Sequence, residues 1–204
     1  MIGQPVVAAG STPLIEGGLS ARGGMTRRRA LMTLPALGAG LLTLSGLLGT
    51  AAEAADTAGD RFDFLSANGN SNCSAAFMDS IAKMPASARL QGSCCSAMDR
   101  QRYLKQVQGL VKYRAIPDIP SDPYDIVAGL AQKLMGRYDD KLTTIEQRAY
   151  EYAMDHSQER GPCCCQCWRW QVYGGLAKLL IRERQFTGKQ IVEVWNLSDG
   201  CGGA

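Results

Sequence analysis

Residues 161–184 read GPCCCQCWRWQVYGGLAKLLIRER, and this stretch decides the fold class that the sequence predicts. Gly161 and Pro162 are typical of a helix start, because proline at the first helical position loses no hydrogen bond there. Beyond the cysteines, apolar side chains recur at helical spacing, at Trp168, Val172, Leu176, Leu179 and Leu180. We therefore expect a helix from Pro162 to about Arg184 whose first turn carries four cysteines.

Helical spacing also marks the segments on both sides of this stretch. Apolar periodicity and capping residues predict five further helices, over residues 76–84, 96–114, 122–136, 143–156 and 189–197. No run alternates between apolar and polar residues for long enough to indicate a strand, and no internal repeat is visible. The sequence therefore predicts an all-α fold, a small irregular helical bundle.

The first quarter of the chain has the pattern of an export signal. Arg27 and Arg28 precede an uncharged stretch, residues 31–52, that is rich in Leu, Gly and Ala. A small-x-small pattern that a signal peptidase recognises ends at Ala54, where we expect cleavage. The arginine pair favours a twin-arginine signal over residues 25–54, with an ordinary secretory signal as the alternative.

The rest of the chain is expected to form one exported domain. Residues 1–24 show no hydrophobic period and are predicted to be disordered or to precede the true start at Met25. A polar linker is predicted over 55–72 and a cysteine-rich helical domain over 73–204. We expect a periplasmic or secreted protein that meets a membrane only through an uncleaved signal. The net charge of +3 arises largely in the signal, which argues against a nucleic-acid partner.

All eight cysteines follow the predicted cleavage site, at positions Cys73, Cys94, Cys95, Cys163, Cys164, Cys165, Cys167 and Cys201. Three interpretations stay open. The cysteines could form structural disulfides, because an exported protein meets oxidants. They could bind a soft metal, because thiolates select monovalent copper, zinc or iron-sulfur centres. They could also exchange thiols and disulfides, because a helix N-terminus lowers thiol pKa.

We predict the metal interpretation, with monovalent copper as the ion and zinc as the other suitable metal. A twin-arginine signal exports a folded protein, so the thiols could bind metal in the reducing cytoplasm before they meet an oxidant. A metal-donor or metal-acceptor protein is then the expected partner. The predicted ligands are Cys163, Cys165, Cys167 and Cys201, with Cys164, Cys94 and Cys95 as further candidates.

The spacing of these cysteines limits how they can meet. Four thiols within five residues, 163–167, cannot all converge from a regular helix. A site that uses three of them needs a loop-like first turn or a ligand from another segment. Cys94 and Cys95 are expected at another helix start, after Gly92 and Ser93. The two helix starts could share one metal site or be joined by a disulfide.

The segment from Pro162 to Cys167 is similar to the signature of the PCYCGC-motif proteins, a family of exported bacterial proteins. Pro162, Cys163, Cys165 and Cys167 match it, whereas Cys164 replaces its tyrosine and Gln166 its glycine. The stretch from Asp199 to Cys201 resembles the second cysteine-bearing segment of that family. A looser likeness to the twin-arginine-exported copper storage proteins, which are cysteine-lined helical bundles, implies a soft-metal site.

The remaining candidates do not point to an enzyme. His156 is the only histidine, seven residues before Cys163, and could be a further metal ligand. A single histidine leaves a Cys/His pair as the main base-assisted nucleophile scheme. The sequence contains no phosphate-binding loop and no dinucleotide fingerprint. We therefore expect a binding protein rather than an enzyme.

Overall fold

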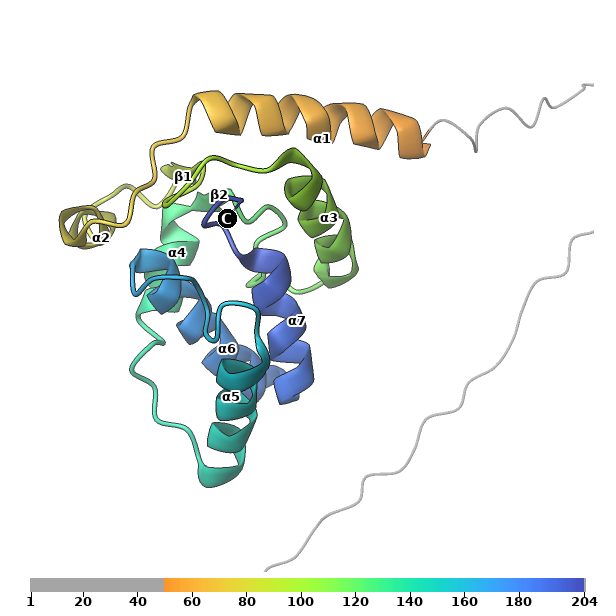
Figure 1. Ribbon diagram of the computed structural model, residues 1–204. Helices are drawn as coiled ribbons and strands as arrows, with labels where there is room; N and C mark the ends of the chain where they lie inside the picture. The colour runs from red at the N-terminus through yellow and green to blue at the C-terminus, as the bar shows by residue number, and fades with distance from the viewer. Residues whose placement is uncertain (1–49, 204) are drawn as a thin grey trace, which may run out of the picture. The chain divides into compact units, whose positions relative to one another are not determined.

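A computed structural model of the chain describes residues 50–203, with side chains from residue 57 onward. The predicted helical class is confirmed, because this part of the chain forms seven α-helices and one small sheet (Figure 1). The helices are α1 (Thr50–Ala67), α2 (Ala75–Ile81), α3 (Arg100–Leu110), α4 (Ala128–Met135), α5 (Thr144–His156), α6 (Trp168–Arg184) and α7 (Gly188–Ser198). A 3-10 turn, η1 (Val111–Tyr113), extends α3, and the strands are β1 (Arg89–Gln91) and β2 (Asp125–Val127).

Helix α6 is the centre of the hydrophobic core. It packs against α4, α5 and α7, and α7 in turn packs against α3 and α5 (Figure 1). Trp168, Val172 and Leu176 on α6 are fully buried, as are residues on its other faces. A helix that is apolar on most sides is typical of a core element. At Gly175 a side chain would collide with the carbonyl of Leu134, so glycine permits the close approach of α4 and α6.

The sheet is the main feature that the sequence does not predict. Strands β1 and β2 pair antiparallel, with Leu90 opposite Ile126, and both of these side chains are buried. Each strand has only three residues, which is too short for an alternating pattern to show. The buried carboxylate of Asp125 forms ion pairs with Arg61 on α1 and Arg89 on β1, so charge as well as apolar packing holds the sheet in place.

The observed helix boundaries agree best with the predicted ones where a capping residue fixes the helix start. Thr143 and Glu146 form a capping box at the start of α5, and Thr187 caps α7 in the same way. The helix expected from residue 122 begins at Ala128 instead, because β2 takes up residues 125–127. The helix expected from residue 96 begins after its N-cap, Asp99. Residues 55–67, which we expected in a polar linker, are helical as part of α1.

The largest correction concerns the stretch quoted first. Helix α6 begins at Trp168 with Cys167 as its N-cap, rather than at Pro162, and residues 157–166 are irregular. The backbone N–H of Cys167 donates to the carbonyl of Cys165, a tight turn that no α-helix contains. A regular first turn would spread the thiols around the helix axis. The irregular chain instead allows them to converge on one centre.

Residues 1–49, which include most of the predicted signal at 25–54, lie outside the described residues, and residues 50–54 form the first part of α1. None of the helices between residues 50 and 203 combines the length and the apolar character that a membrane span requires.

Candidate metal centre

The fold brings all eight cysteines together from four segments. One lies before α2, two lie between β1 and α3, four precede α6, and one follows α7. All eight are free thiols. Each belongs to at least one group of three whose sulfur atoms lie within 4.8 Å of one another, and these groups share members. The thiols therefore form one continuous cluster.

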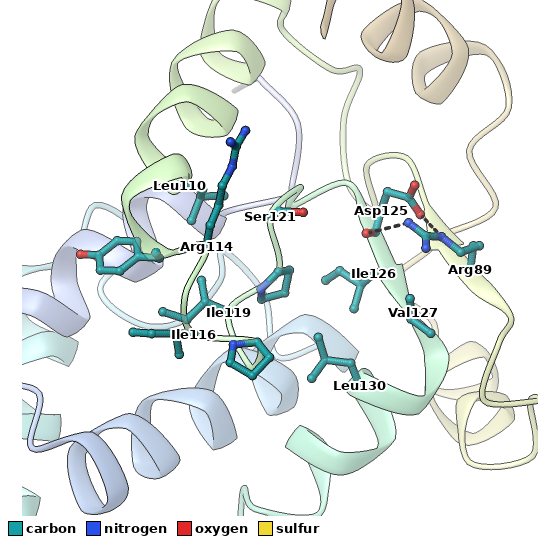
Figure 2. A pocket seen from close by; sticks show the side chains of 13 residues that line it. Arg89, Leu110, Arg114, Ile116, Ile119, Ser121, Asp125, Ile126, Val127 and Leu130 are labelled. Carbon is teal, nitrogen blue, oxygen red and sulfur yellow. Dashed lines mark hydrogen bonds and ion pairs between the residues drawn. The ribbon is translucent and has the colours of Figure 1, made fainter. Parts of the chain in front are cut away.

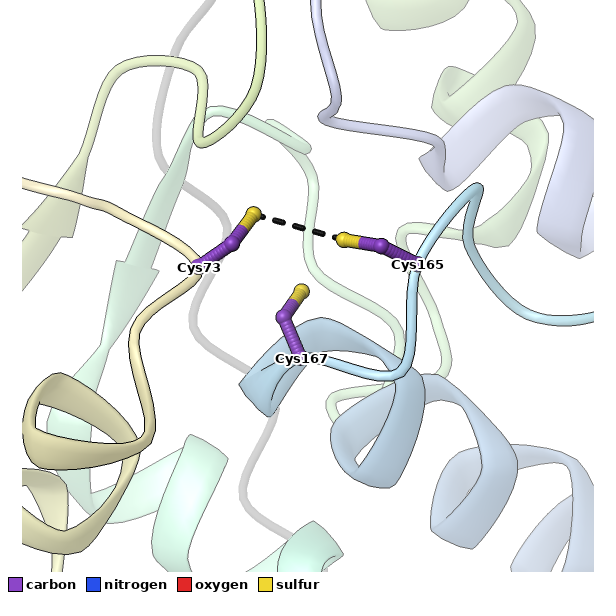
Figure 3. A group of neighbouring side chains, drawn as sticks. All are labelled: Cys73, Cys165 and Cys167. Atoms are coloured by element: carbon purple, nitrogen blue, oxygen red, sulfur yellow. Dashed lines mark hydrogen bonds between the residues drawn. The ribbon is translucent and has the colours of Figure 1, made fainter.

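Four thiols form the more exposed part of the cluster, the outer layer: Cys73, Cys95, Cys164 and Cys165. The Sγ atom of Cys95 lies 3.1 Å from that of Cys73 and 3.5 Å from those of Cys164 and Cys165. The Sγ atoms of Cys73 and Cys165 lie 3.3 Å apart, and Figure 3 shows them pointing toward each other from two separate segments. Cys95 and Cys164 are exposed, so the outer layer is open to solvent.

The other four thiols form the inner layer: Cys94, Cys163, Cys167 and Cys201. Cys163, Cys167 and Cys201 are only 1%, 3% and 5% exposed. The Sγ atom of Cys201 lies 2.7 Å from that of Cys163 and 4.0 Å from that of Cys94, and Cys163 and Cys167 lie 4.0 Å apart. Three of the inner thiols thus lie within the hydrophobic core, and Cys94 packs against it.

The neighbouring residues Cys94 and Cys95 join the two layers, with their Sγ atoms 3.7 Å apart. Four of the five groups of three span both layers, among them the group of Cys73, Cys165 and Cys167 (Figure 3). Thiolates bound to one zinc ion at about 2.3 Å in a tetrahedron lie about 3.8 Å from one another. The sulfur atoms of the cluster are already at comparable separations, so they could hold a metal ion with little rearrangement.

A buried arginine lies against the inner layer. Arg169 on α6 is fully buried, and its guanidinium donates hydrogen bonds to the carbonyls of Gly92, at 2.9 Å, and Pro123. Its Nε has no partner, and no ion pair between described residues includes it. A buried cation without a carboxylate is costly unless another negative group is close.

The inner thiols are the groups that can supply this negative charge. Burial lowers the pKa of Arg169, but Tyr173 and the thiols of Cys94, Cys163 and Cys201 raise it by more, so the guanidinium stays charged. A thiolate or a metal-thiolate complex at the inner layer would be stabilised by this cation. The guanidinium therefore favours at least one ionised sulfur in the inner layer and would stabilise further thiolates that form when a metal binds.

The thiols of the inner layer differ in acidity. Hydrogen bonds from Cys163, Cys167 and Cys201 lower the pKa of Cys94, and Arg169 lowers it further, against the effect of burial. Hydrogen bonds with Cys167, Cys201 and Cys94, together with burial, raise the pKa of Cys163. For Cys167, the hydrogen bond with Cys163 lowers the pKa, whereas Cys94 and burial raise it, to about 11. Cys94 is thus the first inner thiolate, and its neighbours hold the protons that a metal would displace.

The C-terminal segment places Cys201 in the cluster. The backbone N–H of Cys201 donates to Asp199, and its carbonyl accepts hydrogen bonds from the N–H and the hydroxyl of Ser96. Gln106 on α3 donates to the carbonyl of Asp199. Gly202 has a φ of 101°, a backbone conformation that is unfavourable for residues other than glycine. These bonds tie the segment to the loop that carries Cys94 and Cys95.

No family model, no curated protein and no solved structure matches this chain. The function therefore has to be argued from the site itself.

The seven cysteines predicted as ligands all lie in this cluster, and the structure adds Cys73. Cys73 is not among the predicted ligands, although its place directly before the N-cap Ser74 parallels that of the other cysteines before helices. His156 does not join the cluster. Its Nδ1 lies 2.8 Å from the carbonyl of Tyr152, and its ring stacks on that residue.

A pocket on another part of the surface does not contribute to this chemistry. Ile116, Ile119 and Leu130 give it an apolar wall, and the paired Arg89 and Asp125 lie at one side (Figure 2). No cysteine is among the residues that line it. The cluster is therefore the stronger candidate for function.

Proposed function

We propose that this chain is an extracytoplasmic protein that binds monovalent copper through cysteine thiolates. The observation that carries the proposal is the meeting of eight free thiols from four segments in one cluster. Thiolates are soft ligands, and monovalent copper is a soft ion. Free thiols would lie scattered if each served only the packing of its own helix. Their convergence beside a buried arginine instead supports a site for a cation with several anionic ligands.

Copper suits the grouping of the thiols better than zinc does. The groups with mutual separations within 4.8 Å contain three sulfur atoms each. Monovalent copper commonly takes two or three thiolates, whereas a structural zinc site takes four ligands at the corners of a tetrahedron. The predicted twin-arginine signal supports the proposal as well, because copper could then be bound before export.

A thiol-disulfide protein is the alternative, and one contact favours it. The Sγ atoms of Cys163 and Cys201 lie 2.7 Å apart, close enough for oxidation to join them with little movement of the chain. However, both are buried, whereas a redox-active thiol has to meet its partner at the surface. The two functions predict different thiol contents in the protein as isolated.

Copper titration of the reduced protein without air tests the proposal. We expect uptake in competition with a chelator, a sulfur-to-copper charge-transfer absorption, and release of protons as thiols ionise. Changing Cys163, Cys165 and Cys167 together to Ser should abolish uptake and leave most of the helical circular dichroism. His156→Ala is the matched control and should bind copper as the parent does. Disulfides mapped within the cluster in protein taken from its own compartment would contradict the proposal.

A further inference from the structure

The two layers of the cluster differ in their access to solvent. The inner layer contains Cys163, Cys167 and Cys201, which are almost fully buried, and the partly buried Cys94. The outer thiols are exposed or only partly buried. A metal ion in the inner layer would be shielded from solutes, whereas one in the outer layer could be reached by a ligand from outside.

We infer that the layers hold separate copper ions, and that the outer ion is exchanged with the thiols of a donor or acceptor protein while the inner ion is retained. This inference rests on the proposed function and adds a division of labour to it. Separate roles for the two copper ions require two complete ligand sets. They also require a reason why the inner ion is retained and a route by which the outer ion is exchanged.

Two complete ligand sets exist without sharing a sulfur atom. In the outer layer, the Sγ atoms of Cys73, Cys95 and Cys165 lie 3.1, 3.3 and 3.5 Å apart in pairs. In the inner layer, the sulfur atoms of Cys94, Cys163 and Cys201 lie within 4.8 Å of one another. Each set could bind one copper ion in a trigonal arrangement. Cys164 and Cys167 remain as additional ligands next to the outer and inner sets.

Retention of the inner ion follows from charge and burial. Three thiolates and one monovalent copper ion carry a net charge of −2, which is costly to bury without a cation. Arg169, fully buried, interacts electrostatically with all three thiols of the inner set. Its guanidinium is fixed by hydrogen bonds to Gly92 and Pro123, so it compensates this charge without moving. The outer thiols are exposed or only partly buried, so water can offset their charge.

Exchange at the outer set needs no oxidation or reduction. An incoming thiolate forms a bond to copper, and the Cys95 thiolate then leaves copper and takes up a proton from solvent. A second incoming thiolate then binds copper as the Cys73 and Cys165 thiolates leave and take up protons, so copper passes from three thiolates to two and stays monovalent throughout. Cys95 is the natural point of entry, because it is exposed and lies within 3.5 Å of the other three outer sulfur atoms. The partner is therefore a protein with accessible thiols.

The test is transfer of copper from the loaded protein to a synthetic peptide with a C-x-x-C pair, followed by native mass spectrometry without air. We expect at least two copper ions per chain and two phases of transfer, with the slow phase at least tenfold slower than the fast. Cys95→Ser should remove the fast phase and one copper ion, and leave the slow phase. Cys201→Ser should remove the slow phase and leave the fast one. His156→Ala should preserve both phases.

The outcomes separate this inference from the proposed function. A chain that binds no copper overturns both. A chain that binds one ion only, or transfers all its copper in one phase, overturns the inference and leaves the proposed function standing. The inference also fails if Cys95→Ser keeps the fast phase while its circular dichroism matches the parent. If Cys201→Ser unfolds, the Cys95→Ser variant decides, because the Cys95 side chain is exposed and lies outside the hydrophobic core.

Discussion

At the scale of single residues, Arg169 decides what the inner layer can hold. A fully buried guanidinium that binds two backbone carbonyls and has no carboxylate partner is unusual in a core of this size. Its charge favours one ionised thiol in the copper-free inner layer and stabilises the further thiolates that form when a metal binds. The same side chain also holds the loop of Gly92 against α6, so it supports both the charge and the geometry of the site.

We predict that Arg169→Met weakens copper binding and lowers the free energy of unfolding. The inner thiolates lose their counter-charge, and the carbonyls of Gly92 and Pro123 lose their hydrogen-bond donor. Each buried carbonyl left without a partner costs about 1–3 kcal/mol of folding free energy. Arg169→Lys is the control, because it keeps the charge and loses the planar fork. Copper competition and chemical unfolding measure the two effects. Equal copper affinity in the parent and the Met variant would contradict the role given to the charge.

The acidity of the thiols predicts how copper binding depends on pH. Burial raises the pKa of Cys73 and Cys95, and hydrogen bonds to its neighbours raise that of Cys163, so these thiols are protonated in the copper-free protein at neutral pH. Each must lose its proton to bind. Copper affinity should therefore rise with pH, by about tenfold per pH unit for each proton released. Chelator competition between about pH 6 and about pH 8 checks the slope, and a flat profile would exclude these thiols as ligands.

At the scale of elements, the C-terminal segment after α7 is the part on which the inner layer most depends. Its backbone bonds to Ser96 and the positive φ of Gly202 hold Cys201 beside Cys163. At Gly202 a side chain would collide with the carbonyl of Ser96. A substitution there should displace the segment without changing any cysteine.

We predict that Gly202→Ala reduces copper retention and costs about 1–3 kcal/mol of stability through the strained backbone. Gly136→Ala is the matched control, since a side chain at the end of α4 would meet only ordinary contacts. Thermal unfolding and the slow phase of copper transfer measure the result. If both variants behave as the parent, the segment does not position Cys201.

The elements also show how far the sequence predicts the fold. The capping residue Thr143 locates the start of α5 correctly, because a cap is a local interaction, and the apolar spacing over 189–197 locates α7 to within one residue at each end. The start of α6 is wrong in the sequence prediction, because Pro162 and the apolar residues after it fit a helix start equally well. Tertiary contacts override this local preference, because the thiols of residues 163–167 meet thiols from three other segments. Strands of three residues leave no periodic signal at all.

At the scale of the whole molecule, the composition of the site follows from long-range contacts that sequence reasoning could only partly foresee. The sequence allows a metal site shared between the cysteines at 94–95 and those at 163–167, because both groups are expected at helix starts. Cys73 also directly precedes a helix cap, Ser74, but is not among the predicted ligands, and the buried Arg169 had no such signal. An arginine in an apolar helical run appears as an ordinary surface residue until its neighbours are known.

The distribution of the ligands over four segments predicts how copper affects stability. The core around α6 is built from aliphatic and aromatic side chains that are buried independently of the metal. We therefore expect the copper-free reduced protein to keep the helical circular dichroism of the loaded protein. Copper should nevertheless stabilise the protein, because the ion joins segments far apart in the chain. The expected gain in the free energy of unfolding is about 2.7 kcal/mol when free copper is about 100 times the dissociation constant.

Amide hydrogen exchange with and without copper locates this stabilisation. Protection should increase in the four cysteine-bearing segments, 71–75, 92–97, 161–167 and 199–203, and change little in α5, which carries no ligand. Thr143→Ala is a useful control, because loss of the α5 cap should cost about 1 kcal/mol in both states and leave the copper effect unchanged. If copper instead protected α5 as strongly as the four segments, the metal would be acting through global folding and not through the cluster, and the placement of the ligands given above would be wrong.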